Sequence, residues 1–157
     1  MSAIIVYFST TGNTETVATR LAATTNFPIK RLLPAEPYPT AFDEKMKRWH
    51  QERDHDLRPA ITTTVDLSAY DTIYLGYPIW SNNLPAIPRT FLEAHDWTGK
   101  NIIPFCTNGG SGFGQSLDRI RQLAAAATIL PGFEIYNTQI DHSASLETWL
   151  ESQKQSS

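Results

Sequence analysis

The chain has 157 residues, of which 41% are hydrophobic and 18% charged, a composition that fits one globular domain and excludes an intrinsically disordered chain. The formal net charge of −3 gives no support for nucleic-acid binding, and no nucleic acid is expected as a partner. A single cysteine, Cys106, short apolar runs and the lack of a secretory signal favour a cytoplasmic protein without a membrane partner.

The first predicted element is a strand over Ala3–Phe8, an apolar run rich in β-branched and aromatic residues. A helix is predicted over Thr14–Thr25, where Val17, Ala18 and Leu21 share one face. The chain therefore begins as strand, tight loop and helix.

The loop Ser9–Thr14 has a hydroxyl or amide side chain at five of its six positions and glycine at the remaining one. It lies at a helix N-terminus, where backbone N–H groups and the helix dipole favour an anion. No Lys or Arg occurs between Ser9 and Thr16, so we expect a phosphate to be held there by neutral donors. A plain N-cap by Thr11 or Asn13 is the alternative, but six consecutive small polar residues exceed what a cap requires.

The second strand is predicted over Phe27–Leu33 and the second helix over about Ala41–Asp54. At the start of this helix, Thr40 and Asp43 have the spacing of a capping box. Three apolar residues share one of its faces, namely Phe42, Met46 and Trp49.

Charged residues of both signs alternate along this helix and just beyond it, five basic against five acidic. They are Lys45, Lys47, Arg48, Arg53 and Arg58 against Asp43, Glu44, Glu52, Asp54 and Asp56. Such alternation is typical of a solvated helix face rather than of a nucleic-acid patch.

The third and fourth predicted strands, Thr72–Ile79 and Asn101–Thr107, are nearly continuous apolar runs, as in strands buried on both faces of a parallel sheet. A helix over Pro85–His95 separates them, with prolines only in its first turn, where they are tolerated. The remaining predicted elements are a helix over Gln115–Ala127, a strand over Phe133–Ile140 and a helix over Ala144–Ser152.

Strand and helix alternate five times, which predicts an α/β fold: a three-layer, doubly wound sandwich around an open parallel sheet. No linker or repeat interrupts this pattern, so residues 1–152 are predicted to form one domain and residues 153–157 a polar tail. In such folds ligands bind beyond the carboxyl ends of the strands, so the loops after the central strands form the candidate site.

The loops after the third and fourth strands differ in chemistry from the loop after the first strand. The second loop, within Gly76–Pro85, presents the large aromatic Trp80 at the exit of a strand. The third, Thr107–Gly114, is so rich in glycine that its backbone can approach a flat ligand closely. The alternatives are a core or interface position for Trp80 and a plain flexible turn for the glycines.

These three loops resemble those of the flavodoxin family, and the resemblance covers essentially the whole chain in element order and length. Ser9–Thr14 is similar to the family's phosphate loop, Leu75–Trp80 to its second flavin loop and Phe105–Gly112 to its third. The resemblance implies a flavodoxin-like fold, with a five-stranded parallel sheet in the order 2-1-3-4-5. It also implies that the cofactor is FMN.

The resemblance implies distinct roles for the three loops. The first would hold the 5′-phosphate, Trp80 would stack on or flank the isoalloxazine ring, and the backbone of the second and third loops would border the ring's edges. The implied cofactor-binding residues are Ser9, Thr10, Thr11, Gly12, Asn13, Thr14, Pro78, Ile79, Trp80, Ser81, Asn82, Asn83, Thr107, Asn108, Gly109, Gly110, Ser111, Gly112 and Phe113. No catalytic side chain is implied.

Two positions depart from the family pattern. Many flavodoxins have a glycine just after the aromatic residue of the second loop, where this chain has Ser81, Asn82 and Asn83. Asparagine tolerates the left-handed backbone region better than most residues. In the third loop, only Phe113 is near enough in sequence to be a second ring-flanking aromatic.

Other site types fit less well. Gly110–Gly114 reads G-x-G-x-G, whereas the dinucleotide fingerprint needs G-x-G-x-x-G and an acid at the end of the next strand. Cys106 heads a loop as in cysteine phosphatases, but Gly112 stands where their arginine is needed, so a buried structural thiol is favoured. The four histidines lack ligand spacing, so no metal site is predicted.

We therefore expect a flavodoxin-like redox protein that transfers electrons through a non-covalently bound FMN. An NAD(P)H-dependent flavin or quinone reductase on the same fold and a non-enzymatic flavin-binding sensor are the alternatives. The expected partners are a redox partner protein or a small-molecule electron acceptor. With 16 acidic against 13 basic residues, the chain lacks the strong acidity with which flavodoxins dock on basic partners.

Overall fold

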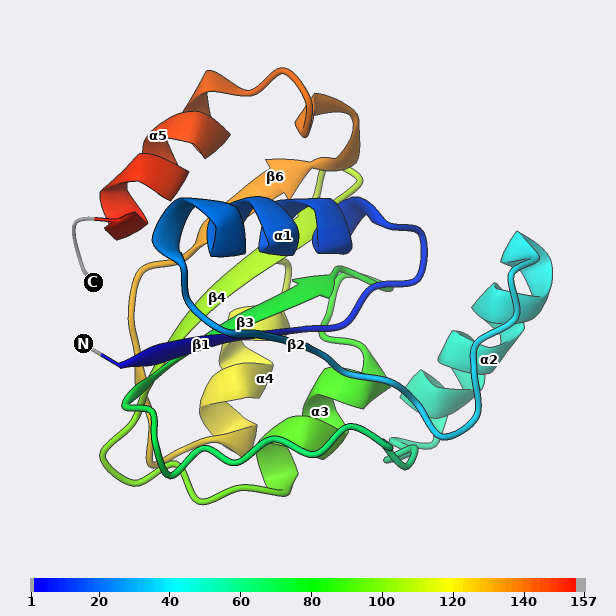
Figure 1. The fold of residues 1–157 in the computed structure, drawn as a ribbon. Coiled ribbons are helices and arrows are strands. Elements are labelled where there is room, and N and C mark those ends of the chain that lie inside the picture. The colour runs from blue at the N-terminus through cyan, green and yellow to red at the C-terminus, as the bar shows by residue number, and fades with distance from the viewer. Residues whose placement is uncertain (1, 155–157) are drawn as a thin grey trace.

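Parallel strands form the sheet at the centre of the molecule, in a computed structural model that describes residues 2–154 (Figure 1). The strands are β1 (Ala3–Tyr7), β2 (Ile29–Arg31), β3 (Thr72–Pro78), β4 (Asn101–Asn108), β5 (Thr128–Ile129) and β6 (Phe133–Tyr136). Their order is β2-β1-β3-β4-β5, with β6 also paired to β4. The predicted α/β class and the order 2-1-3-4-5 are confirmed, and a sixth strand is added.

Helices cover both faces of this sheet (Figure 1). They are α1 (Asn13–Thr25), α2 (Phe42–Asp54), α3 (Ala86–Glu93), α4 (Ser116–Leu123) and α5 (Ala144–Lys154). Helices α1 and α5 lie on one face and α3 and α4 on the other, while α2 lies beyond the carboxyl ends of the strands (Figure 1). None of the helices in residues 2–154 is long and apolar enough to cross a bilayer.

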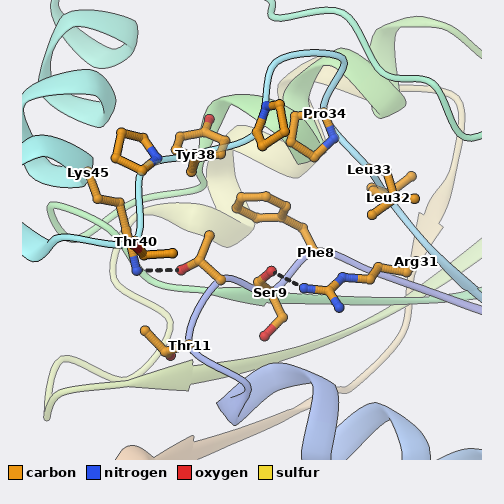
Figure 2. Close-up of a pocket in the computed structure, with 13 residues that line it drawn as sticks. Phe8, Ser9, Thr11, Arg31, Leu32, Leu33, Pro34, Tyr38, Thr40 and Lys45 are labelled. Carbon is orange, nitrogen blue, oxygen red and sulfur yellow. Dashed lines mark hydrogen bonds between the residues drawn. The ribbon is translucent and has the colours of Figure 1, made fainter.

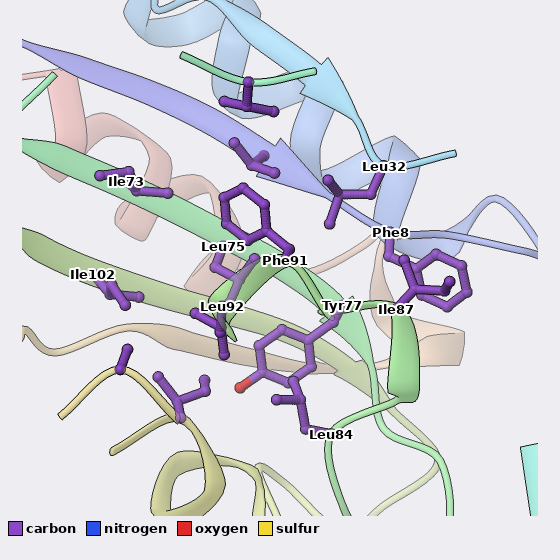
Figure 3. Close-up of a cluster of buried hydrophobic side chains, with 14 of the residues drawn as sticks. Phe8, Leu32, Ile73, Leu75, Tyr77, Leu84, Ile87, Phe91, Leu92 and Ile102 are labelled. Atoms are coloured by element: carbon purple, nitrogen blue, oxygen red, sulfur yellow. The ribbon is translucent and has the colours of Figure 1, made fainter. Parts of the chain in front are cut away.

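Each central strand contributes apolar side chains to both faces, which explains its continuous apolar sequence. In β1, Ile4 and Val6 face the layer of α3 and α4, whereas Ile5 faces that of α1 and α5. Figure 3 shows the first of these layers, where Phe91 and Tyr77 pack with the strand residues. Complete burial of one such side chain contributes about 1.5–3 kcal/mol relative to exposure.

The edge beyond β4 differs from the predicted fifth strand, Phe133–Ile140. The strand β6 ends at Tyr136, and a 3₁₀ helix follows over Asn137–Gln139. The short β5 pairs with the first residues of β4, and β6 pairs with its last four. Two short strands thus share one edge position, and at Gly132 between them a Cβ would overlap the Pro104 carbonyl oxygen.

The second helix has the predicted span but not the predicted contacts. Its N-cap is Ala41 with no side-chain cap, so the capping box of Thr40 and Asp43 is not formed. Phe42 is 63% exposed, whereas Lys45 and Glu52 are buried. The expectation that the charged side of this helix is solvated was therefore wrong for these two residues.

The last two helices end at positions other than those predicted. Helix α4 ends at Leu123, and Ala124 packs into the core as its C-cap. Helix α5 extends to Lys154, so it includes the first two residues of the predicted tail. The remaining tail, residues 155–157, lies outside the described residues.

The stability of this fold is expected to decrease as the pH falls below about 6.5, in part because of His95. Its ring packs against Phe91 and Trp97, at centroid distances of 4.9 and 6.2 Å, and burial lowers the pKa of His95. Because the pKa is lower in the folded state, the unfolded chain binds the proton more tightly. The contribution of the neutral His95 ring to the free energy of unfolding is complete above about pH 6.5, the pKa of histidine in an unfolded chain. It is lost as the pH falls from there through the lowered pKa of the folded state.

Urea denaturation at several pH values between 8 and 5 measures this effect. Replacement His95→Gln should flatten the acid slope of the unfolding free energy relative to wild type. An identical slope in wild type and His95→Gln would show that the ring's burial has no pH-dependent consequence.

Candidate functional site

A cavity of about 350 Å³ lies where the loops after β1, β3 and β4 meet at the carboxyl edge of the sheet. We call it the three-loop cavity. Its lining residues are Thr10, Thr11, Asn13, Phe42, Lys45, Trp49, Pro78, Ile79, Trp80, Thr107, Gly109 and Asn137. All three predicted loops contribute to it, and α2 adds three residues that the sequence did not indicate.

The first loop presents a helix N-terminus to this cavity. The N-cap of α1 is Gly12 at φ +96°, with no side-chain cap, so neither Thr11 nor Asn13 caps the helix as the alternative required. The uncapped N–H groups of the first turn remain available to an anion. Thr10, Thr11 and Asn13 line the cavity with their polar groups.

The other residues of the first loop shape it from within. Ser9 is buried, and its Oγ accepts a hydrogen bond from the Gly12 amide at 3.2 Å. Thr14 is also buried, and its hydroxyl shares a 2.8 Å hydrogen bond with that of Thr107. This bond joins the first loop to the third.

Lys45 brings a positive charge to the first loop. Its side chain is only 6% exposed, and Nζ donates to the Thr10 hydroxyl at 3.3 Å. No carboxylate of the described residues forms an ion pair with it. Arg31 also reaches the loop, donating to the Ser9 carbonyl at 2.9 Å and pairing with Glu15. Two cationic side chains that the sequence did not indicate therefore lie beside the loop, in addition to its neutral donors.

The second loop makes a tight turn after Trp80. Trp80 and Asn83 exchange two backbone hydrogen bonds of 3.1 Å, and the residues between them, Ser81 and Asn82, have φ of 52° and 63°. Two successive left-handed residues are typical of a type I′ turn. The Ser81 hydroxyl accepts hydrogen bonds from Trp49 Nε1 at 3.2 Å and from Arg53 at 3.0 Å, so α2 holds the turn in place.

Trp80 is half-buried in an aromatic cluster at the cavity wall. Its ring stacks on Trp49, with centroids 4.8 Å apart and an interplanar angle of 19°. Phe8 and Tyr38 meet it in edge-on contacts, with centroids at 5.4 and 5.3 Å. Trp80 thus lies at the predicted cleft, and the second aromatic at this wall is Trp49 from α2, whereas Phe113 of the third loop does not line the cavity.

Residues of the third loop line two separate hollows. Thr107 and Gly109 line the three-loop cavity. The residues that instead line a separate hollow of about 530 Å³ beside β6 are Asn108, Gly110, Gly112 and Phe113. Phe113 also packs on the core layer of α3 and α4, and Ser111 is exposed and lines neither hollow. Contact with the cofactor stays a prediction for these five residues, as it does for the residues that line the three-loop cavity.

Cys106 is buried directly before this loop. Burial raises the pKa of its thiol well above the usual range, and Sγ lies 3.7 Å from the Gly112 carbonyl oxygen. Such a thiol is a poor nucleophile at neutral pH. Within residues 2–154, no group of three or more His, Cys, Asp or Glu residues is placed to hold a metal ion.

Replacement Gly114→Ala should destabilise the site, because the second and third loops meet there. Gly114 has φ +54°, a Cβ would overlap the Asn82 carbonyl oxygen, and the next amide, of Gln115, donates to that oxygen at 2.8 Å. We expect a loss of about 1–3 kcal/mol in the free energy of unfolding, measured in urea. Gly109→Ala is the control, since a Cβ there meets no atom within 4 Å. Equal losses in both variants would contradict this role.

The chemistry of the three-loop cavity fits FMN. Hydroxyls, an amide, uncapped backbone N–H groups and the Lys45 ammonium are all donors, as a phosphate dianion requires. Phe42, Trp49 and Trp80 give the cavity an aromatic side that suits a flat ring. The two kinds of surface meet in one cavity.

Comparisons with known proteins point the same way. The family model described as Flavodoxin matches residues 2–153. A structure from Bacteroides eggerthii that is assigned as a flavoprotein is 30% identical, with a TM-score of 0.80 and coverage of 96% of both chains.

Two further solved structures are similar in fold. A flavoprotein from Lactobacillus acidophilus in complex with FMN is 18% identical over 89% of this chain and 96% of that chain, with a TM-score of 0.75. The two-electron reduced flavodoxin of Megasphaera elsdenii is 24% identical over 98% of each chain, with a TM-score of 0.63. No curated protein sequence matches the chain.

Proposed function

The chain belongs to the flavodoxin family, and we propose that it is a redox protein that binds FMN in the three-loop cavity. The observation that carries the proposal is the meeting of phosphate-type donors and an aromatic wall in one cavity, at the carboxyl edge of the sheet. Fold alone would not suffice, because one fold hosts many functions.

The phosphate is held by the first loop. The N-terminus of α1 and the side chains of Thr10, Thr11 and Asn13 donate hydrogen bonds to it. Lys45 supplies the compensating charge, and its burial strengthens the attraction because screening by water is weak there. The hydrogen bond between Thr14 and Thr107 fixes the loop before the ligand arrives.

The ring lies against the aromatic side of the cavity. Trp80 is held in place by edge-on contacts with Phe8 and Tyr38, by its stack on Trp49 and by the turn at Ser81. Thr107 and Asn137 supply polar groups for the ring's edge. FMN supplies the redox chemistry when bound, and the chain orients it and limits its contact with water.

We propose electron transfer to a redox partner protein or a small-molecule acceptor as the role of the bound flavin. Phe42 lines the cavity and is 63% exposed, so it offers a partner an apolar contact beside the cofactor. The cytoplasm stays the predicted compartment, because a single cysteine is consistent with a reducing environment.

An anaerobic titration of the FMN-loaded protein tests the carrier role. Dithionite should bleach the flavin absorbance, whereas NADH and NADPH should leave it unchanged over minutes. Rapid bleaching by NADPH would contradict a carrier and assign the NAD(P)H-dependent reductase instead. If the protein retains FMN but the flavin is neither reduced by dithionite nor reoxidised by a chemical oxidant, a structural or sensory flavin is favoured.

A further inference from the structure

A second cavity, of about 470 Å³, lies on the other side of the first loop, between the carboxyl ends of β1 and β2 (Figure 2). We call it the β1–β2 cavity. Its lining residues are Phe8, Ser9, Thr10, Thr11, Arg31, Leu32, Leu33, Pro34, Pro37, Tyr38, Pro39, Thr40 and Lys45. Its volume is in the range of small-molecule sites, and the proposed flavin site uses only Thr10, Thr11 and Lys45 of its lining.

The charged side chains that line the β1–β2 cavity are all basic. Its two charged lining residues are Arg31 and Lys45, and no acidic residue is among the described residues that line it. In Figure 2 these two side chains lie at opposite ends of the hollow, with Phe8 between them. Arg31 is paired with Glu15, so Lys45 is the charge that lacks a carboxylate partner. In the flavin-free protein this buried cation lacks an anion, which is costly, and an anion bound from either cavity offsets that cost.

The remaining wall is apolar and fixed. Tyr38 is held by a 2.5 Å hydrogen bond from its hydroxyl to Glu52 and by the Arg48 guanidinium, 3.7 Å above its ring centroid. Phe8 packs against Tyr38 at 5.5 Å. Leu33 lines the cavity although 49% of it is exposed, which leaves apolar surface for a ligand to cover. A wall that is already ordered loses little entropy on binding.

We propose that the β1–β2 cavity binds a small aromatic carboxylate, with its acid group at Lys45 and its ring on Phe8, Leu33 and Tyr38. Thr10, Thr11 and Lys45 line both cavities, so this anion and the flavin phosphate share one buried cation. Each ligand therefore weakens the other's binding by an equal factor, about five- to tenfold. This coupling rests on the proposed position of the phosphate, whereas binding of the acid alone does not.

Calorimetric titration of the FMN-loaded protein with 2-naphthoate tests the site, with 2-naphthalenemethanol as the uncharged probe. We expect saturable 1:1 binding of the acid and at least tenfold weaker binding of the alcohol. Replacement Leu33→Glu should weaken naphthoate binding at least tenfold, because it replaces the apolar surface under the ring with a carboxylate that the ring would desolvate. Leu57→Glu is the matched control, since Leu57 is 45% exposed and does not line this cavity, and it should change binding less than twofold.

FMN binding in the same variants separates this proposal from the proposed function. Leu33→Glu should keep wild-type FMN affinity, because Leu33 does not line the three-loop cavity. With rising naphthoate, the apparent Kd of FMN should increase to a plateau. An increase without a plateau would mean that naphthoate competes in the flavin site and would overturn the proposal. Absent naphthoate binding, or equal binding to the Leu33→Glu and Leu57→Glu variants, would also overturn it while leaving the FMN site intact.

Discussion

Replacement Lys45→Glu is expected to lower the affinity for FMN about 100-fold or more, while the affinity for riboflavin changes less than about threefold. Lys45 is buried beside Thr10 and lines the three-loop cavity. Charge reversal removes an attraction to the phosphate dianion and adds a repulsion, and a 100-fold loss corresponds to about 2.7 kcal/mol. Riboflavin has no phosphate, so it does not experience this change. Quenching of flavin fluorescence measures both affinities.

Two further variants control this result. Lys47→Glu makes the same charge change on the same helix, but Lys47 has a side chain that is 73% exposed and pairs with Glu44, so FMN affinity should stay within about threefold. Lys45→Met keeps the apolar stem without the charge and should cost about tenfold if the Glu variant fails to fold. An equal loss of affinity for riboflavin and for FMN in the Lys45→Glu variant would contradict the assignment of Lys45 to the phosphate.

Replacement Trp80→Ala should weaken the binding of FMN and of riboflavin by the same factor, about 30-fold, because Trp80 contacts the isoalloxazine ring that both flavins share. The variant should also lose about 2–3 kcal/mol of unfolding free energy, since Trp80 packs with Phe8, Tyr38 and Trp49. Ligand titration and urea denaturation measure the two effects separately.

The control for this variant is another stacked tryptophan. Trp149 stacks on Phe133, with centroids 5.1 Å apart, in the layer of α1 and α5. Trp149→Ala should lose stability to a similar extent and keep flavin affinity. If Trp80→Ala weakens FMN far more than riboflavin, Trp80 acts on the phosphate end and its assignment to the ring is wrong.

The sequence was sufficient to predict the central strands of the sheet, because their burial on both faces determines the pattern of apolar residues. The strands β1, β3 and β4 are apolar on both faces, and a short run of β-branched residues such as Ile4 and Ile5 is typical of a strand buried in this way. The far edge could not be predicted in the same way. Two residues, Thr128 and Ile129, are too few to show a period, and they form β5 only because β4 offers free backbone groups there.

The candidate site was predicted where it depends on the loops and missed where it depends on α2. Phe42 and Trp49 were identified as one apolar face, but tertiary contacts place Trp49 on Trp80 and leave Phe42 exposed. Lys45 belongs to a run of alternating charges that normally indicates a solvated face. A clue was available in its spacing, because Lys45 and Glu52 are seven residues apart and share the buried side of the helix.

Titration of the flavin-free protein with FMN and with riboflavin tests the central claim most directly. We predict that one FMN binds per chain with a Kd of about 1 μM or lower and with quenched fluorescence. Riboflavin should bind about 100-fold more weakly, because the donors around Thr10 and Lys45 then lack their anion. Absence of FMN binding, or equal affinity for the two flavins, would contradict the assignment of the three-loop cavity as an FMN site.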